Sequence, residues 1–171
     1  MLVLLSLITA VSLLVGPSAL FPPSETGTAV FERACLSSTP MTREGLADIA
    51  RQQGWRTVDS DTPAEQDWRA VYRAGGYVVR LDQHRGATEN PGERICIVAV
   101  GPAPRGWKDK VSALQVNGAP VGAPDTYDHT VYRMPPELEL TVWDLPDGSR
   151  IHALREPDSN LELSVNYPTG R

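Results

Sequence analysis

The chain has 171 residues and a formal net charge of −5, all of it after the first 24 residues, because Glu25 is the first charged side chain. A mildly acidic chain without a Lys/Arg cluster argues against nucleic acid as a partner, since phosphate neutralisation dominates that affinity, and equally against anionic membrane surfaces. Residues 25–171 have the size of one domain, and no internal repeat, low-complexity tract or linker divides them.

The first 24 residues carry the pattern of a secretory signal peptide. An apolar run at residues 2–15 precedes small residues at 16, 18 and 19, as in the core and cleavage region of such a peptide. The run is shorter than the roughly 20 apolar residues that span a membrane. We therefore expect cleavage within residues 18–29, and export of a mature domain without stable membrane insertion. An uncleaved N-terminal anchor and a mis-assigned start codon are the alternatives.

Two predicted elements carry the two cysteines. Residues 28–35 place their apolar side chains at helical spacing, with Thr28 as N-cap and Cys35 near the end. Cys96 lies in "ICIVAV", a short apolar run rich in β-branched residues that predicts a central strand. A helix packed on such a strand would bring the sulfurs together, and two cysteines in an exported chain favour a disulfide. We predict a Cys35–Cys96 bridge, with two buried free thiols as the alternative if the leader is not a signal peptide.

Two helices are predicted between the cysteines. One runs from a cap at Thr39 or Thr42 to a stop at Gly54. The other covers residues 62–74, where Thr62 and Glu65 at capping-box spacing mark the start and a Gly-Gly pair marks the end. Its buried stripe would be Trp68, Val71 and Tyr72.

Strand patterns dominate the rest of the chain. Residues 77–82 and the strand around Cys96 predict an antiparallel pair, and a helix is expected within residues 104–118, with Gly118 as its stop. Four segments of strand length follow, at 129–134, 138–144, 150–155 and 161–167. This order predicts an α+β domain, in which helices cover one face of an antiparallel sheet and one disulfide ties the single domain. A small half-barrel and a mixed sheet with one parallel pair are the alternatives.

The segment "ELTVWDLPDGSRIHALRE" predicts a β-hairpin with the three-residue loop Pro146-Asp147-Gly148, in which Gly148 takes the left-handed conformation. The resulting register makes five cross-strand pairs: Asp144 with Arg150, Trp143 with Ile151, Val142 with His152, Leu140 with Leu154 and Glu139 with Arg155. The side chains expected to pack under the helices are Leu138, Leu140, Val142 and Leu154.

The other face of this hairpin supplies a candidate binding site. It carries Trp143, Ile151 and Arg155, and exposed aromatic and arginine side chains are typical interface anchors. The alternative is that Trp143 covers its own hairpin or is buried by the C-terminal strand.

The sequence contains no G-x-S-x-G elbow, P-loop, G-x-G-x-x-G, H-E-x-x-H or EF-hand motif. Its densest polar cluster, "DTYDHTVY", places Asp128 beside His129, and these two could join His152 in an acid–base site. Adjacent residues in a strand point to opposite faces, so a polar loop leading into a strand is the simpler interpretation. We expect no metal site and no cofactor.

The motif Phe31-x-x-x-Cys35, the helix ending at Gly54-Trp55 and the lone strand cysteine resemble small exported proteins of Gram-negative bacteria, a group without an assigned biochemical function. The similarity covers residues 28–100; it implies export and the disulfide, and it carries over no catalytic residue. We therefore expect a periplasmic or extracellular protein that acts as a binding or interaction module for an envelope or extracellular protein partner. A hydrolase-type enzyme with a His/carboxylate site and a structural envelope component are the alternatives, and the lack of catalytic motifs disfavours the enzyme.

Overall fold

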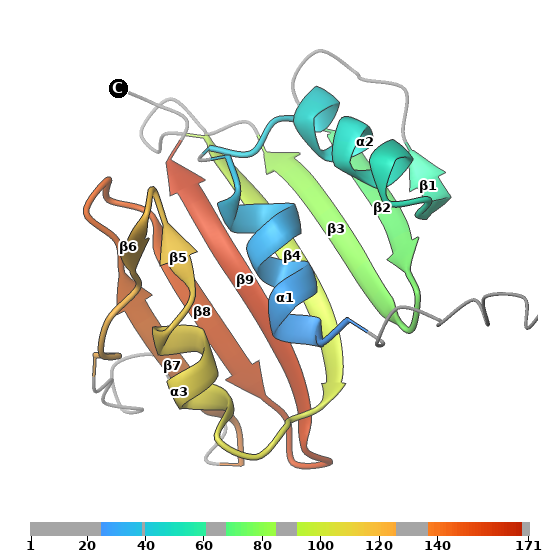
Figure 1. The fold of residues 1–171 in the computed structure, drawn as a ribbon. Helices are drawn as coiled ribbons and strands as arrows, with labels where there is room; N and C mark the ends of the chain where they lie inside the picture. Colours follow the sequence, from blue (N-terminus) through green and yellow to red (C-terminus); the bar gives the residue numbers. More distant parts are fainter. Residues whose placement is uncertain (1–24, 39, 61–67, 85–91, 126–136, 169–171) are drawn as a thin grey trace, which may run out of the picture.

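The computed structural model describes residues 25–38, 40–60, 68–84, 92–125 and 137–168. One antiparallel seven-stranded sheet, in the order β1-β2-β3-β4-β9-β8-β7, forms the centre of the fold (Figure 1). Its strands are β1 (Arg56–Ser60), β2 (Trp68–Ala74), β3 (Tyr77–His84), β4 (Glu93–Pro102), β7 (Glu139–Asp144), β8 (Arg150–Arg155) and β9 (Asn160–Pro168). The remaining elements are α1 (Gly27–Phe31), the π-helical turn η1 (Glu32–Leu36), α2 (Arg43–Gln52), α3 (Trp107–Ser112), β5 (Gln115–Val116) and β6 (Ala119–Pro120).

The predicted α+β class is wrong, because the protein is mostly β and its described helices are short. The largest error concerns the helix expected at residues 62–74, whose described part, Trp68–Ala74, forms strand β2. Ala70, Tyr72 and Ala74 are buried while Arg69 and Arg73 are exposed, an alternation with the period of a strand. The apparent capping box at residues 62–65 lies outside the described residues.

The glycine pair after β2 is a hairpin turn and not a helix stop. Ala74 pairs with Tyr77, so Gly75 and Gly76 make a two-residue loop between β2 and β3. Gly75 has a φ of 60°, the conformation that a type II′ turn requires at its first central position. A Gly-Gly pair between two runs of β-branched and aromatic residues is a hairpin signal, and here it outweighs the helical spacing of Trp68, Val71 and Tyr72.

The helix expected at residues 104–118 is also shorter than predicted. Helix α3 ends at Ser112, and β5 and β6 follow as a small antiparallel hairpin. Asn117 and Gly118 form its two-residue turn with φ values of 52° and 80°, which a type I′ turn requires at both positions. The Asn-Gly pair thus closes a hairpin where a helix stop was predicted.

Helix α2 confirms its predicted start and stop. Thr42 is the N-cap, and its Oγ1 accepts a hydrogen bond of 3.0 Å from the Gly45 amide. Gly54 takes a φ of 66°, and the Trp55 amide donates back to the Ala50 carbonyl at 2.8 Å, the pattern of a Schellman motif.

Replacing Thr42 with alanine is expected to lower the free energy of unfolding by about 1 kcal/mol, because an N-terminal amide of α2 loses its acceptor. Urea denaturation of the mature domain measures the change. Thr42→Ser keeps the hydroxyl and serves as the matched control, with a midpoint close to that of the wild type. Equal losses in the two variants would assign the effect to the methyl group and not to the cap.

The predicted disulfide is confirmed. Cys35 in η1 and Cys96 in β4 are bonded, with a Cα–Cα distance of 5.6 Å, and both side chains are fully buried. The first helix begins earlier than predicted, because Thr26 and not Thr28 caps it and accepts from the Ala29 amide at 3.3 Å. Helix α1 and η1 lie across the middle of the sheet in Figure 1 and contact β4, so the bridge ties the helical layer to the central strand.

The β7–β8 hairpin confirms the predicted register at all five pairs. The Leu145 amide donates to the Ser149 carbonyl at 2.9 Å, and Gly148 has a φ of 86°. The predicted orientation of its faces is wrong. Trp143 and Ile151 are 0% exposed and belong to the core, whereas Leu140 and Leu154 are only half-buried. Val142, also expected to pack under the helices, is 1% exposed but lies outside the main core cluster.

The reason for this inversion is the cover supplied by α3. The Trp143 indole Nε1 donates to Ser112 Oγ at 3.1 Å, and its ring meets that of Trp107 edge to face at a centroid distance of 6.3 Å. Strand β7 carries large apolar side chains on both faces, so its own pattern does not determine which face is covered.

Candidate functional site

In the part of the chain that the structure describes, helices pack on one face of the sheet and none packs on the other. The described helices and the β5–β6 hairpin all lie on the same side of the sheet (Figure 1). We call the opposite side the open face. Because side chains alternate along a strand, it displays the residues that lie between the core positions.

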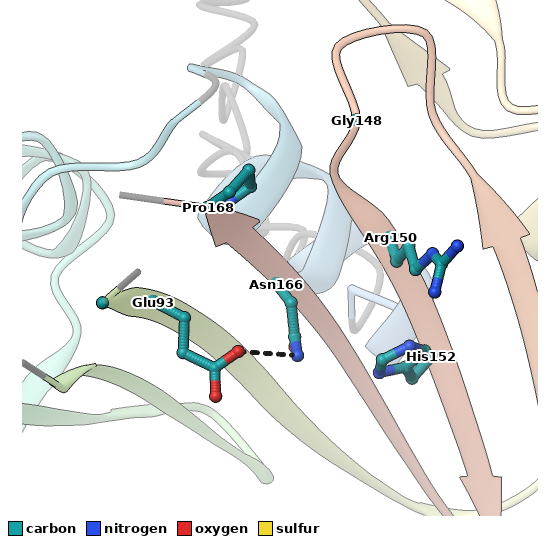
Figure 2. A pocket seen from close by; sticks show the side chains of 7 residues that line it. Glu93, Gly148, Arg150, His152, Asn166 and Pro168 are labelled. Atoms are coloured by element: carbon teal, nitrogen blue, oxygen red, sulfur yellow. Dashed lines mark hydrogen bonds between the residues drawn. The ribbon is translucent and has the colours of Figure 1, made fainter. Parts of the chain in front are cut away.

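A recess of about 410 Å³ opens where β4, β9 and β8 lie side by side on the open face. Figure 2 shows the polar side chains that line it, Glu93 of β4, Asn166 of β9, and Arg150 and His152 of β8. Gly92, Gly148 and Pro168 complete its wall. We call this site the polar recess.

The sheet register brings these residues together from distant parts of the chain. Asn166 is the Cα partner of Arg150 on β8, and His152 follows Arg150 by two positions on the same face. Asn166 Nδ2 donates to Glu93 Oε2 at 3.4 Å, the contact that Figure 2 marks with a dashed line. Arg150 Nε lies 2.5 Å from Asp144 Oδ1, so the Arg150 guanidinium forms an ion pair with a carboxylate of β7.

His152 is the titratable group that this environment changes. Burial lowers its pKa below the ordinary 6.5, and the positive charge of Arg150 lowers it further, while Glu93 and Asp144 act in the opposite direction. The imidazole is therefore neutral at pH 7. A neutral imidazole offers a ligand one hydrogen-bond donor and one acceptor.

The lowered pKa of His152 makes stability depend on pH. As the pH falls below 6.5, the unfolded chain takes up a proton at this residue before the folded protein does. Stability that is present above pH 6.5 is therefore lost as the pH falls through the folded pKa. The variant His152→Gln is expected to lose less stability than the wild type between about pH 7 and pH 5, measured by urea denaturation.

His84 provides the matched control for this experiment, because it is exposed at the end of β3. The variant His84→Gln removes a histidine that does not line the polar recess, and it shows how much of any change follows from the loss of a histidine as such. Identical pH profiles for His152→Gln and the wild type would contradict the assigned environment of His152.

Of the residues proposed from sequence for an acid–base site, only His152 can be placed. It lines the polar recess, whereas Asp128 and His129 lie outside the described residues. His152 thus lines the same recess as a carboxylate from another strand, Glu93. No local motif marks Glu93 or Asn166, since each reaches the recess through strand pairing.

The proposed anchor set Trp143, Ile151 and Arg155 does not form an exposed surface. Trp143 and Ile151 are buried in the core, which excludes them as exposed contacts on this fold. Arg155 pairs with Glu139 at 3.0 Å, and Lys108 approaches the same carboxylate at 2.6 Å. These two cations lower the pKa of Glu139, so the three residues form a surface ion-pair network that joins α3 to β7 and β8.

Within the described ranges, no group of three or more His, Cys, Asp or Glu side chains is placed to hold a metal ion. None of the helices in those ranges is long and apolar enough to cross a membrane. Comparison of the chain with protein-family models, with curated proteins and with solved structures finds no match.

Proposed function

We propose that this protein is an exported binding module of the periplasm or extracellular space, and that the polar recess takes a small ligand of amino-acid type. The observation that carries the proposal is that Glu93, Arg150, His152 and Asn166, from three neighbouring strands, line one recess on the open face. A small number of polar groups at a concave site can fix the orientation of a small ligand.

The chemistry of the four side chains defines the ligand. Arg150 presents a planar set of donors that suits a carboxylate, and the Asn166 amide and the His152 imidazole can add further hydrogen bonds. Glu93 carries a negative charge that suits an ammonium or hydroxyl group. A molecule with a carboxylate and an amine a short distance apart can therefore bind to Arg150 and Glu93 at the same time. The recess volume of about 410 Å³ lies in the range of small-molecule sites.

Export is supported by two features that arise in different parts of the chain. The first 24 residues have a signal-peptide pattern, and Cys35 and Cys96 are joined in a disulfide of the kind that persists in oxidising compartments. Cell fractionation followed by N-terminal sequencing tests this part of the proposal. A periplasmic or secreted product that begins between residues 19 and 30 is expected, and a cytoplasmic product that starts at Met1 would contradict it.

Saturation-transfer NMR tests the ligand class with three probes: glycine, acetate and methylamine. Glycine should receive the strongest saturation from the mature domain, because acetate lacks the group that faces Glu93 and methylamine lacks the group that faces Arg150. The variant Arg150→Gln should weaken glycine binding about tenfold or more, the typical effect of losing a hydrogen bond to a charged group.

Arg105→Gln is the matched control, because it removes the same charge from an exposed residue two positions before α3 that does not line the polar recess. This variant should bind glycine like the wild type. The proposal fails if glycine receives no saturation from the wild type, or if the two arginine variants bind it equally well.

A further inference from the structure

The open face of β1–β3 gathers arginines that the sequence keeps apart. They are Arg56 of β1, Arg69 and Arg73 of β2, and Arg80 of β3. The acidic residues on the same surface of β1–β3 are Asp59 and Asp82, and Glu162 of β9 also interacts with Arg80. The four arginines still outnumber these three acidic residues, in a chain whose net charge is −5. We call these four arginines the arginine patch. It lies two or more strands away from Asn166, Arg150 and His152 of the polar recess.

Two of these arginines stand directly opposite each other. Arg56 and Arg73 are Cα partners in the β1–β2 pair, which places their side chains on one face as nearest neighbours. Both are exposed, and no acidic group of the described residues lies within 4 Å of either guanidinium. Like charges directly opposite each other destabilise a sheet. Such a pair therefore lowers stability unless an anion joins it.

The other two arginines are held in place by one buried carboxylate. Asp82, whose side chain is 5% exposed, lies 3.1 Å from Arg69 Nε and 2.9 Å from Arg80 Nε. The arginine side chains remain 49% and 40% exposed, so their outer nitrogens are accessible to solvent. One negative charge offsets only one of the two positive charges. A side chain that is already fixed loses less conformational entropy on binding, which favours this pair as an anion-binding element.

The four arginines and Asp59 lie around Val71 at the centre of the patch. Val71 pairs with Arg80 on β3 and with Asp59 on β1, and Arg69 and Arg73 lie two positions away from it along β2. Diagonal neighbours in an antiparallel sheet are about 7–8 Å apart, so the guanidinium groups span a short row across three strands. A row of planar donors fits a chain with several anionic groups better than it fits one small ion.

We propose that the arginine patch binds an anionic polysaccharide chain. A flat membrane surface would face much of the protein at once, and attraction to the patch would be opposed by the net charge of −5. A narrow chain contacts the patch alone. An acidic peptide would need a buried apolar anchor for tight binding, and the patch offers only the half-buried Val71 at its centre. The proposal does not depend on the ligand of the polar recess.

Binding of a heparin oligosaccharide, a sulfated polysaccharide, tests the proposal with the full mature domain. We expect binding at about 50 mM salt that weakens steeply toward about 200 mM, because counterions are released from the chain. The double variant Arg56→Gln/Arg73→Gln should bind about tenfold more weakly, since each exposed charge contact contributes modestly. Its thermal midpoint should equal or exceed that of the wild type, because the opposed like charges are gone.

The matched control is Arg51→Gln, which removes an exposed charge from α2, on the far side of the sheet. It should leave heparin binding unchanged. Absence of heparin binding at low salt would overturn the proposal. So would a loss of heparin affinity per removed charge that is as large for Arg51→Gln as for the double variant. Tighter binding to phosphatidylglycerol vesicles or to poly-glutamate than to heparin would also overturn it, because the partner would then belong to another class.

Discussion

Replacing Trp143 with alanine is expected to lower the free energy of unfolding by about 3–5 kcal/mol, the usual cost of removing a large aromatic side chain from a core. Trp143 is fully buried, packs edge to face on Trp107 and donates a hydrogen bond to Ser112. The substitution would leave a cavity under α3, and the Ser112 hydroxyl would lose the hydrogen bond from the Trp143 indole. Equilibrium denaturation in urea, followed by far-UV circular dichroism, measures the loss.

Leu140→Ala is the matched control, because Leu140 lies on the same strand but on the open face and is half-buried. It should cost clearly less than Trp143→Ala. If Leu140→Ala is the more damaging of the two, the faces of the β7–β8 hairpin are oriented as the sequence predicted and not as described for this fold. If Trp143→Ala does not fold, the milder Trp143→Phe keeps the comparison measurable.

Reduction of the Cys35–Cys96 bridge is expected to lower the free energy of unfolding by about 4 kcal/mol. The bridge closes a loop between residues 61 positions apart, and a constraint of that length removes much of the entropy of the unfolded chain. Urea denaturation of the oxidised wild type and of the double variant Cys35→Ala/Cys96→Ala gives the difference.

Thiol titration provides the control for the disulfide experiment. Denatured, unreduced protein should contain no reactive thiol, and two thiols should appear after reduction. Two thiols before reduction, or equal stability of the oxidised protein and the double variant, would contradict the bridge as a stabilising link between the helical layer and β4.

The features that the sequence predicted correctly are those that depend on short-range chemistry. The cap at Thr42, the turn at Gly148 and the register of β7 on β8 depend on residues within one helix or one hairpin. Their geometry follows from the φ preferences of glycine and from the hydrogen-bonding capacity of a threonine hydroxyl. The disulfide was predictable because the chain has only two cysteines.

The errors arise where a local pattern supports two structures. Residues 68–74 fit a helical stripe through Trp68, Val71 and Tyr72 and also a strand with Ala70, Tyr72 and Ala74 inward. Pairing with β1 on one side and β3 on the other decides for the strand, and that pairing is not local. The same holds for Trp143, whose burial depends on α3, about thirty residues earlier in the chain.

The candidate site was accessible to sequence analysis only in part. His152 stood out because histidines are few, but its neighbour Asn166 belongs to β9 and Glu93 to β4. These three residues meet only because β9, the last strand in the chain, inserts between β4 and β8. A sheet order with such an insertion cannot be inferred from strand patterns alone.

Chemical-shift mapping by ¹⁵N NMR tests the central claim, that the open face of the sheet is where this protein binds its ligand. Titration of the mature domain with glycine should shift the amides of Arg150, His152 and Asn166, together with the side-chain amide of Asn166. The amides of α2 and α3, on the covered face, should stay in place. Shifts confined to those helices, with β8 and β9 unchanged, would contradict the account.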